Sequence, residues 1–174
     1  MKVFLGSDHQ GFELKEYIKF FLKELKYEIL DFGTYSTKPT DYPFYAQRVG
    51  EAIMRETGNF GILCCYTGIG MSIAANKVTG IRAALCEDVE KARLSREHND
   101  ANVLALGACN YITEEKLDGN QLGQCKEIIK IWLNTPFSSE IRHIKRLEQI
   151  LYIECPDLNM PQVKKEDKPF YFKD

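Results

Sequence analysis

An uninterrupted apolar run from Phe60 to Cys65 leads into a turn that contains glycine and then into a segment that favours helix. An apolar run of this length, without polar alternation, is typical of a strand that is covered on both faces. Gly68 and Gly70 allow backbone N–H groups in the turn to point at an anion, and the alanines that follow favour helix. We therefore expect a buried parallel sheet, with a thiol and a hydroxyl presented at a helix N-terminus for chemistry on an anionic small molecule.

Strand-like and helix-like segments alternate along most of the chain. Repeated right-handed crossovers between parallel strands produce an open sheet with helices on both faces. The predicted fold class is therefore α/β, with an open five-stranded parallel sheet in a Rossmann-like three-layer sandwich, followed by C-terminal helices. The expected strands are 1–6, 27–32, 60–65, 81–86 and 102–106, and the expected helices are 11–25, 42–55, the segment from the turn to 77, 87–98, 127–133 and 138–151.

The chain is long enough for one domain. Its 174 residues, 44% of them hydrophobic, can bury one substantial core, and we predict a single domain over 1–151. The remaining segment, 152–174, contains three prolines, several charges and no hydrophobic period. We expect this tail to be extended or disordered, because it has little apolar surface to bury.

The composition also limits the classes of partner. The net charge is −2 and basic residues are interspersed with acidic ones, so we expect no binding to nucleic acid. No apolar run approaches the roughly 20 residues of a membrane span, and the N-terminus lacks a signal-peptide pattern. The six cysteines include no Cys-x-x-Cys pair and no spacing of a disulfide framework. We therefore expect a cytoplasmic protein with reduced cysteines and no membrane contact.

The predicted topology indicates where a ligand would bind. Ligands of open parallel sheets bind beyond the carboxyl ends of the strands. That rule selects three short stretches without reference to their chemistry, and each of them carries polar or reactive side chains. They are 8–9 after the first strand, 65–70 after the third and 107–110 after the fifth.

Cys64 and Cys65 are adjacent, so on a strand their side chains face opposite sides and only one can face a site. Cys65 is nearer to the turn, and a helix N-terminus favours the thiolate form of a nearby cysteine. Packing alone is the alternative interpretation of either cysteine. Met71 stands where a phosphatase loop needs arginine, and Ile73 stands where a dinucleotide fingerprint needs glycine. An oxyanion cradle beside Cys65 and the hydroxyl of Thr67 remains.

Three further groups could take part in such a site, and each has a structural alternative. His98 ends a predicted helix, where the dipole favours the protonated form that suits a proton donor, although such a histidine can serve only as a cap. Asp8 and His9 follow the first strand directly and could reach a ligand, but an aspartate there is also a common helix cap. Arg142 and Arg146 lie one helical turn apart and would hold a phosphate with paired donors, or else form a solvated face.

Five blocks of sequence, in order and at consistent spacing, carry a more specific pattern than any single motif. They read GSDHxGFxLK at 6–15, TDYP at 40–43, TGxGxSIAANK at 67–77, GIRA at 80–83 and SRxHNDANV at 95–103. In these blocks the chain resembles ribose-5-phosphate isomerase B, of the family shared with galactose-6-phosphate isomerase subunits. The resemblance extends over 1–151.

The resemblance implies reversible conversion of ribose 5-phosphate to ribulose 5-phosphate through an enediolate, in the pentose phosphate pathway and without metal or cofactor. It also implies a homodimer or homotetramer with sites between subunits. By the same resemblance Cys65 is the base that moves a proton between C1 and C2, because a second branch of the family uses a glutamate where Met71 stands. Thr67 and His98 would assist ring opening. The substrate would contact Asp8, His9, Tyr42, Tyr66, Gly68, Ile69, Gly70 and Asn99, and its phosphate would bind His9, Arg142 and Arg146.

The sequence departs from the family pattern at two positions, which leave the substrate open. Tyr66 stands where the family usually has glycine, and Cys109 stands where an arginine usually follows the fifth strand. The alternatives are an isomerase of a six-carbon sugar phosphate, such as galactose 6-phosphate or allose 6-phosphate, and a non-catalytic subunit that binds sugar phosphate. Retention of Cys65, Thr67 and His98 argues against the second alternative, since a pure binder needs neither a base nor a ring-opening acid.

Overall fold

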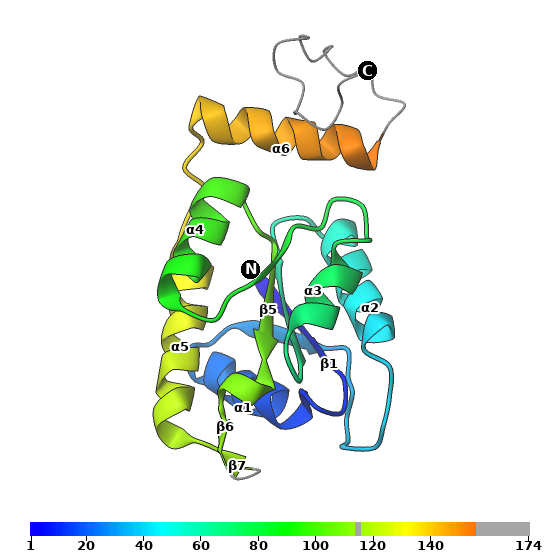
Figure 1. Ribbon diagram of the computed structural model, residues 1–174, viewed down its shortest axis with the longest axis vertical. Coiled ribbons are helices and arrows are strands. Elements are labelled where there is room, and N and C mark those ends of the chain that lie inside the picture. The colour runs from blue at the N-terminus through cyan, green and yellow to red at the C-terminus, as the bar shows by residue number, and fades with distance from the viewer. Residues whose placement is uncertain (114–115, 156–174) are drawn as a thin grey trace, which may run out of the picture. The chain divides into compact units, whose positions relative to one another are not determined.

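The computed structural model describes residues 1–113 and 116–155. The chain forms two compact units, Met1–Ser138 and Ser139–Asp174. In the first unit, five parallel strands form one sheet in the order β2-β1-β3-β5-β4 (Figure 1). This arrangement confirms the predicted fold class. The strands are β1 (Lys2–Ser7), β2 (Glu28–Asp31), β3 (Phe60–Cys65), β4 (Ala83–Leu85) and β5 (Val103–Gly107).

Helices cover both faces of this sheet. α1, α4 and α5 lie on one face, and α2 and α3 lie on the other (Figure 1). Each face has its own hydrophobic core: the first contains Trp132 and Leu14, and the second contains Met71 and Val49. The helices are α1 (Phe12–Glu24), α2 (Tyr42–Arg55), α3 (Ile69–Ala75), α4 (Val89–Asn99) and α5 (Gly119–Asn134).

Aspartate side chains fix the starts of two helices on the first face. Asp88 accepts a hydrogen bond from the backbone N–H of Lys91 at 2.7 Å, where α4 begins. Asp118 accepts the N–H groups of Asn120 at 2.8 Å and Gln121 at 3.0 Å, so α5 begins well before the predicted start at 127. That predicted start is wrong, because the buried Leu122 and Cys125 extend the apolar spacing of Ile129 and Trp132 back toward the cap at Asp118.

Two other segments differ from the sequence prediction. β4 is shorter than the predicted 81–86, because the side-chain oxygen of Asn102 takes the N–H of Arg82 at 2.8 Å. The connection from β5 to α5 contains a 3-10 turn at Ala108–Asn110 and a two-stranded hairpin of β6 (Ile112–Thr113) and β7 (Lys116–Leu117). The sequence pattern did not indicate either, because such short elements have no detectable period.

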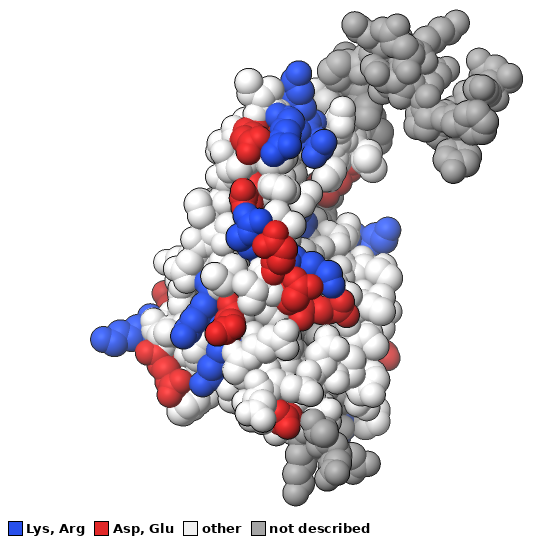
Figure 2. Space-filling model, turned by 60° about the vertical axis from the view of Figure 1, so that its left-hand side comes forward, with Lys and Arg blue, Asp and Glu red and all other residues white. Residues whose placement is uncertain are grey.

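The face that carries α4 bears charges of both signs (Figure 2). At the start of this helix Lys91 pairs with Glu87 at 3.0 Å, and Arg93 pairs with Glu90 at 2.8 Å. Acidic side chains therefore interrupt the basic ones along the helix, and no continuous basic surface forms on this face.

The second unit contains α6 (Ile141–Glu154), which begins and ends later than the predicted 138–151. Ile141 is 72% exposed and Leu151 is 45% exposed, so this helix carries uncovered apolar side chains. The predicted tail lies mostly outside the described residues, and the single domain over 1–151 stays a prediction. No helix in residues 1–113 and 116–155 combines the length and the apolar character that crossing a membrane requires.

Candidate active site

The carboxyl ends of β1 and β3 lie side by side where the strand order reverses. β2 pairs with one side of β1, whereas β3, the next strand along the chain, pairs with the other side of β1. Such a switch point is where open α/β sheets bind ligands. Ser7 pairs in register with Cys64, and the N–H of Asp8 donates to the Cys64 carbonyl at 3.3 Å. The stretches that begin at Asp8 and Cys65 are therefore spatial neighbours.

The two adjacent cysteines of β3 face opposite cores. Cys64 is fully buried in the first core, and burial raises the pKa of its thiol well above the usual value. Cys65 belongs to the second core and is 5% exposed. Its Sγ accepts the backbone N–H of Gly68 at 3.1 Å, from the turn before α3. The prediction that the two side chains face opposite sides of the sheet is confirmed.

Gly68 has a backbone conformation that its surroundings require. Its φ is +75°, and a Cβ there would come within 2.5 Å of Leu85 Cδ1 and 2.9 Å of the Leu106 carbonyl carbon. Glycine fits this left-handed conformation and this close approach, whereas a residue with a side chain does not. In the same turn the hydroxyl of Thr67 accepts the N–H of Ile69 at 3.3 Å. The turn thus brings a thiol, a hydroxyl and backbone N–H groups together.

Aromatic and apolar side chains surround this turn. A Cβ at Gly70 would lie 2.8–3.1 Å from ring atoms of Tyr42, so the ring covers this glycine. Met71 is fully buried in the second core. Tyr42 is 38% exposed, Tyr66 is 54% exposed and Ile69 is 52% exposed. An apolar surface therefore adjoins the thiol.

Asp8 closes the turn that precedes α1. It is 6% exposed, and its Oδ1 accepts the N–H groups of Gln10 at 3.0 Å and Gly11 at 2.9 Å. Burial raises the pKa of Asp8, and the hydrogen bonds from backbone N–H groups offset part of that rise. Asp8 is not the cap of α1, because the N-cap is Gly11 and no side chain caps this helix; Asp8 instead holds the turn before it. The predicted contact of Asp8 with a ligand stays a prediction.

His9 is anchored by a segment that is distant in the sequence. Its Nδ1 lies 3.1 Å from the carbonyl oxygen of Thr40 and 3.2 Å from the backbone nitrogen of the same residue. The hydroxyl groups of Thr40 and Tyr45 are 3.0 Å apart, which ties this contact to α2. Sequence reasoning did not identify Thr40 and Tyr45 as neighbours of His9. The TDYP block that contains Thr40 was the available signal.

His98 and Asn99 are not brought to Cys65 within one chain. α4 runs antiparallel to the strands, so its last residues lie at the amino edge of the sheet (Figure 1). There the carbonyl of Asn99 accepts Nε–H of Arg82 at 3.0 Å, just before β4 begins. Cys65 ends β3 at the opposite edge, and the six residues of that strand span about 16 Å. His98 Nε2 itself lies 3.9 Å from an oxygen of the adjacent Glu97.

Arg142 and Arg146 lie on α6, in the second unit. Nε of Arg142 donates to Glu140 at 2.7 Å, in an exposed pair. The predicted phosphate role of both arginines stays a prediction. Cys109, at the position where the family usually has arginine, is exposed on the 3-10 turn after β5.

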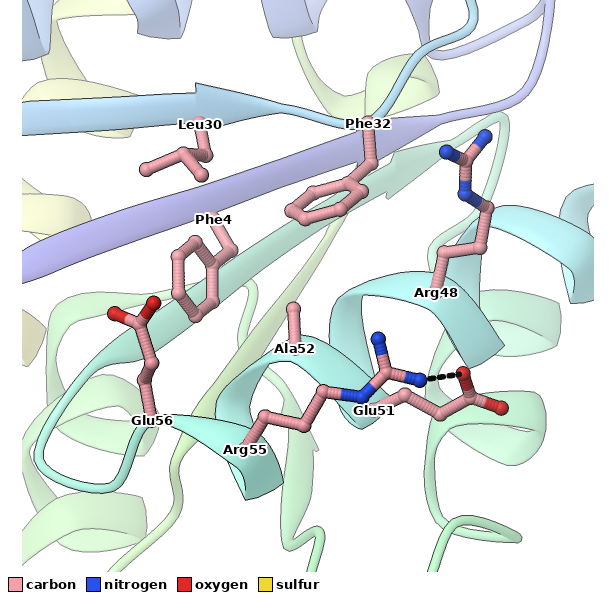
Figure 3. Close-up of a pocket in the computed structure, with 8 residues that line it drawn as sticks. All are labelled: Phe4, Leu30, Phe32, Arg48, Glu51, Ala52, Arg55 and Glu56. Carbon is pink, nitrogen blue, oxygen red and sulfur yellow. Dashed lines mark hydrogen bonds and ion pairs between the residues drawn. The ribbon is translucent and has the colours of Figure 1, made fainter.

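A separate pocket lies along α2 (Figure 3). The rings of Phe4 and Phe32 meet edge to face in it, with centroids 5.8 Å apart, and the guanidinium of Arg48 lies 5.7 Å from the Phe32 ring. Arg55 and Glu51 pair at 3.3 Å on its rim. None of the predicted site residues lines this pocket, so it is distinct from the switch point.

The family model described as Ribose/Galactose Isomerase matches residues 3–150. The chain belongs to this family. Ribose-5-phosphate isomerase B of Escherichia coli (strain K12) is 44% identical over 153 residues, which make up 88% of this chain and 96% of that relative. Ribose-5-phosphate isomerase B of Clostridium thermocellum has a solved structure with a TM-score of 0.80 and 45% identity, covering 90% of this chain and 99% of the other. For the type B ribose 5-phosphate isomerase of Trypanosoma brucei the TM-score is 0.77 and the identity 44%, over 88% and 98% of the two chains.

Membership in the ribose/galactose isomerase family confirms the resemblance seen in the five sequence blocks. The match ends at residue 150, within α6, and so includes Arg142 and Arg146. Assignment to the branch that uses cysteine as base stays a prediction.

Proposed function

We propose that this chain interconverts ribose 5-phosphate and ribulose 5-phosphate through an enediolate, without a metal or another cofactor. The observation that carries the proposal is the sulfur of Cys65, which lies at the carboxyl end of β3 and accepts the N–H of Gly68 at 3.1 Å. Relatives at 44% and 45% identity that are named ribose-5-phosphate isomerase B support it. A cytoplasmic location belongs to the same proposal.

Cys65 acts as the base in this mechanism. As a thiolate it removes the proton from C2 of the open-chain aldose, and the resulting thiol returns a proton to C1 of the enediolate. A positioned base contributes about 10²–10⁴-fold to such a step. Backbone N–H groups of the turn stabilise the negative charge that develops on oxygen. Thr67 and His98 assist ring opening, and Asp8 binds sugar hydroxyl groups.

The site requires a second copy of the chain. His98 and Asn99 lie at the amino edge of the sheet, whereas Cys65 lies at the carboxyl edge. A homodimer or homotetramer supplies both edges to one site, with His98 and Asn99 donated by the partner. The apolar surface beside the thiol supports such an interface, since Ile69 is 52% exposed and Ile73 is 58% exposed one turn along α3. Exposed contiguous apolar side chains of this kind commonly mark interaction sites.

The phosphate of the substrate binds His9, Arg142 and Arg146. Two arginines one turn apart repel each other, and a phosphate between them reverses the sign of that interaction. The anchored imidazole of His9 stands beside Asp8, close to the proposed sugar position. Binding energy from the phosphate, remote from C1 and C2, fixes the reacting carbons beside the sulfur.

A six-carbon sugar phosphate is the second candidate substrate. Cys109 is exposed where the family usually has the longer arginine, which leaves more room near the end of β5. The exposed ring of Tyr66 argues against the larger substrate, because Tyr66 directly follows Cys65 and its ring would take up space beside the thiol.

The proposal is tested by steady-state turnover of ribose 5-phosphate, allose 6-phosphate and galactose 6-phosphate by the purified full chain. We expect the largest kcat/KM for ribose 5-phosphate and no turnover by the Cys65→Ala variant. Preference for a hexose phosphate would replace the substrate assignment. Tight binding of sugar phosphates without any turnover would support a non-catalytic subunit instead.

A further inference from the structure

The ring of Tyr45 is held by packing close to the carboxyl end of β1. Tyr45 lies in the first turn of α2 and packs against the second core. A Cβ at Gly33 would lie 3.0 Å from Cε1 of Tyr45, so the ring covers this glycine. The carbonyl of Gly33 accepts the N–H of Ser7, the last residue of β1, at 2.6 Å. The ring therefore has a fixed place beside the strand that leads to Asp8 and His9.

The hydroxyl group of Tyr45 contacts Thr40 in the connection between β2 and α2. This connection is fixed at its start, where the N–H of Thr34 donates to the carbonyl of Ser7 at 2.7 Å. Near its end, the hydroxyl groups of Thr40 and Tyr45 lie 3.0 Å apart. Because Thr40 lies in no helix or strand, this side-chain contact helps to fix the position of its backbone.

The backbone of Thr40 faces one nitrogen of the His9 ring with both a donor and an acceptor. Nδ1 lies 3.2 Å from the backbone nitrogen of Thr40 and 3.1 Å from its carbonyl oxygen. In the neutral tautomer with its proton on Nε2, Nδ1 accepts the N–H of Thr40. In the imidazolium form, Nδ1 donates to the carbonyl instead. In both of these forms the proton on Nε2 remains available as a hydrogen-bond donor.

The second ring nitrogen of His9 is directed away from Thr40. In the part of the chain that the structure describes, no residue forms a hydrogen bond with Nε2. The side chain is partly buried and directly follows Asp8, at the switch point of the sheet. His9 thus has one nitrogen anchored on the backbone and the other free to donate to a ligand.

We propose that Tyr45 and Thr40 are positioning residues, which hold the imidazole of His9 so that Nε2–H meets the phosphate group of the substrate. This inference rests on the proposed function, which includes phosphate binding by His9. Neither positioning residue touches the phosphate, and both act through His9. A ring that is already oriented loses less freedom when the ligand binds. Loss of either hydroxyl should therefore weaken phosphate binding and leave proton transfer at C1 and C2 nearly unchanged.

The first test is Tyr45→Phe, which removes the hydroxyl and keeps the ring that covers Gly33. The KM for ribose 5-phosphate should rise by about 3–10-fold, as expected for the loss of one hydrogen bond, with kcat changed by less than about 2-fold. The dissociation constant of inorganic phosphate, measured by titration calorimetry, should rise by the same factor. Thr40→Val should give the same rises, whereas Thr40→Ser keeps a hydroxyl and should resemble the wild type.

A double substitution separates positioning of His9 from a general role in the fold. His9→Ala removes the imidazole that Tyr45 and Thr40 hold, and it should weaken phosphate binding more than Tyr45→Phe does. In the His9→Ala background, Tyr45→Phe should change the dissociation constant of phosphate by less than about 2-fold, because residues in one network are not additive. An equal rise in both backgrounds would overturn the proposal, as would unchanged phosphate binding in His9→Ala.

Tyr35→Phe is the matched control, because it removes a hydroxyl from the same connection. The hydroxyl of Tyr35 donates to the carbonyl of Asp31 at 2.7 Å, at the end of β2. This variant should leave the KM and the phosphate affinity unchanged. A rise equal to that of Tyr45→Phe would contradict a specific role of Tyr45.

Phosphate binding can be measured without turnover, which separates this proposal from the proposed function. Additive effects of His9→Ala and Tyr45→Phe in an active isomerase would overturn the positioning role alone. Non-additive effects in a chain without isomerase activity would support the positioning role and remove the proposed function.

Discussion

The two faces of the sheet use the same residue type in different ways. On the face covered by α1, α4 and α5, Cys64, Cys86 and Cys125 are buried packing residues whose thiol pKa values are raised by burial. On the face covered by α2 and α3, Cys65 is held at the strand end by the N–H of Gly68. One step along β3 therefore separates a structural thiol from one placed for chemistry, because side chains alternate along a strand.

The largest expected difference is between substitutions of the two adjacent cysteines. Cys65→Ala should lower kcat by more than about 10²-fold, since it removes the base. Cys64→Ala should retain most of the turnover and instead destabilise the fold by about 1 kcal/mol, because it leaves a small void in the first core. Initial rates with ribose 5-phosphate and thermal unfolding of both variants check this. Equal losses of turnover would contradict the division between the faces.

The second prediction tests whether His98 of a partner chain completes the site that contains Cys65. Cys65→Ala and His98→Ala should each be nearly inactive. A dimer of one chain of each variant should have one intact site, which combines Cys65 of the His98→Ala chain with His98 of the Cys65→Ala chain. Random exchange of subunits then restores about a quarter of the wild-type activity. Rates are measured after the two variants are unfolded together and refolded, with separately refolded variants as controls. No recovery in the mixture would mean that each site is built from a single chain.

A smaller effect is expected from the proposed phosphate ligands. Arg146→Ala should raise the KM for ribose 5-phosphate by about 10-fold, with kcat changed much less, because a lost charged hydrogen bond to phosphate weakens binding. Arg55→Ala is the matched control, since this arginine lies on α2 and pairs with Glu51 far from the thiol. An unchanged KM in Arg146→Ala would remove the phosphate role.

The smallest expected effect is on stability at the turn before α1. The pKa of Asp8 is raised in the folded chain by burial, so the folded state binds its proton more tightly than the unfolded state. Stability from this group is present at low pH and is lost as pH rises above about 4, the unfolded value. Asp8→Asn should therefore gain stability relative to wild type as pH rises from 3 to 6, by less than about 1 kcal/mol. Urea unfolding across that range measures the difference, and the opposite slope would contradict the assigned cause.

Local sequence patterns predicted the features that depend on neighbouring residues. The apolar runs indicated all five strands, the start and end of α2 agree with 42–55, and the alternation at Cys64 and Cys65 predicted which sulfur faces the turn. These properties depend on side-chain direction and local hydrophobic period, which the sequence contains directly.

Local sequence patterns could not predict contacts between segments that are distant in the sequence. Thr40 anchors His9 across 31 positions, and no local period encodes that distance. His98 lies at the opposite edge from Cys65 because α4 returns antiparallel to the strands, a consequence of topology that its block of sequence does not reveal. The early start of α5, by contrast, has local signals, namely the cap at Asp118 and the spacing of the buried Leu122 and Cys125.

The most direct test of the account is proton exchange at the sugar carbons. Ribose 5-phosphate is incubated with the enzyme in D₂O, and deuterium entering C1 and C2 is followed by NMR. The account predicts incorporation by the wild type and by Cys64→Ala, and none by Cys65→Ala while this variant still binds the substrate. Incorporation by Cys65→Ala at the wild-type rate would show that another group is the base.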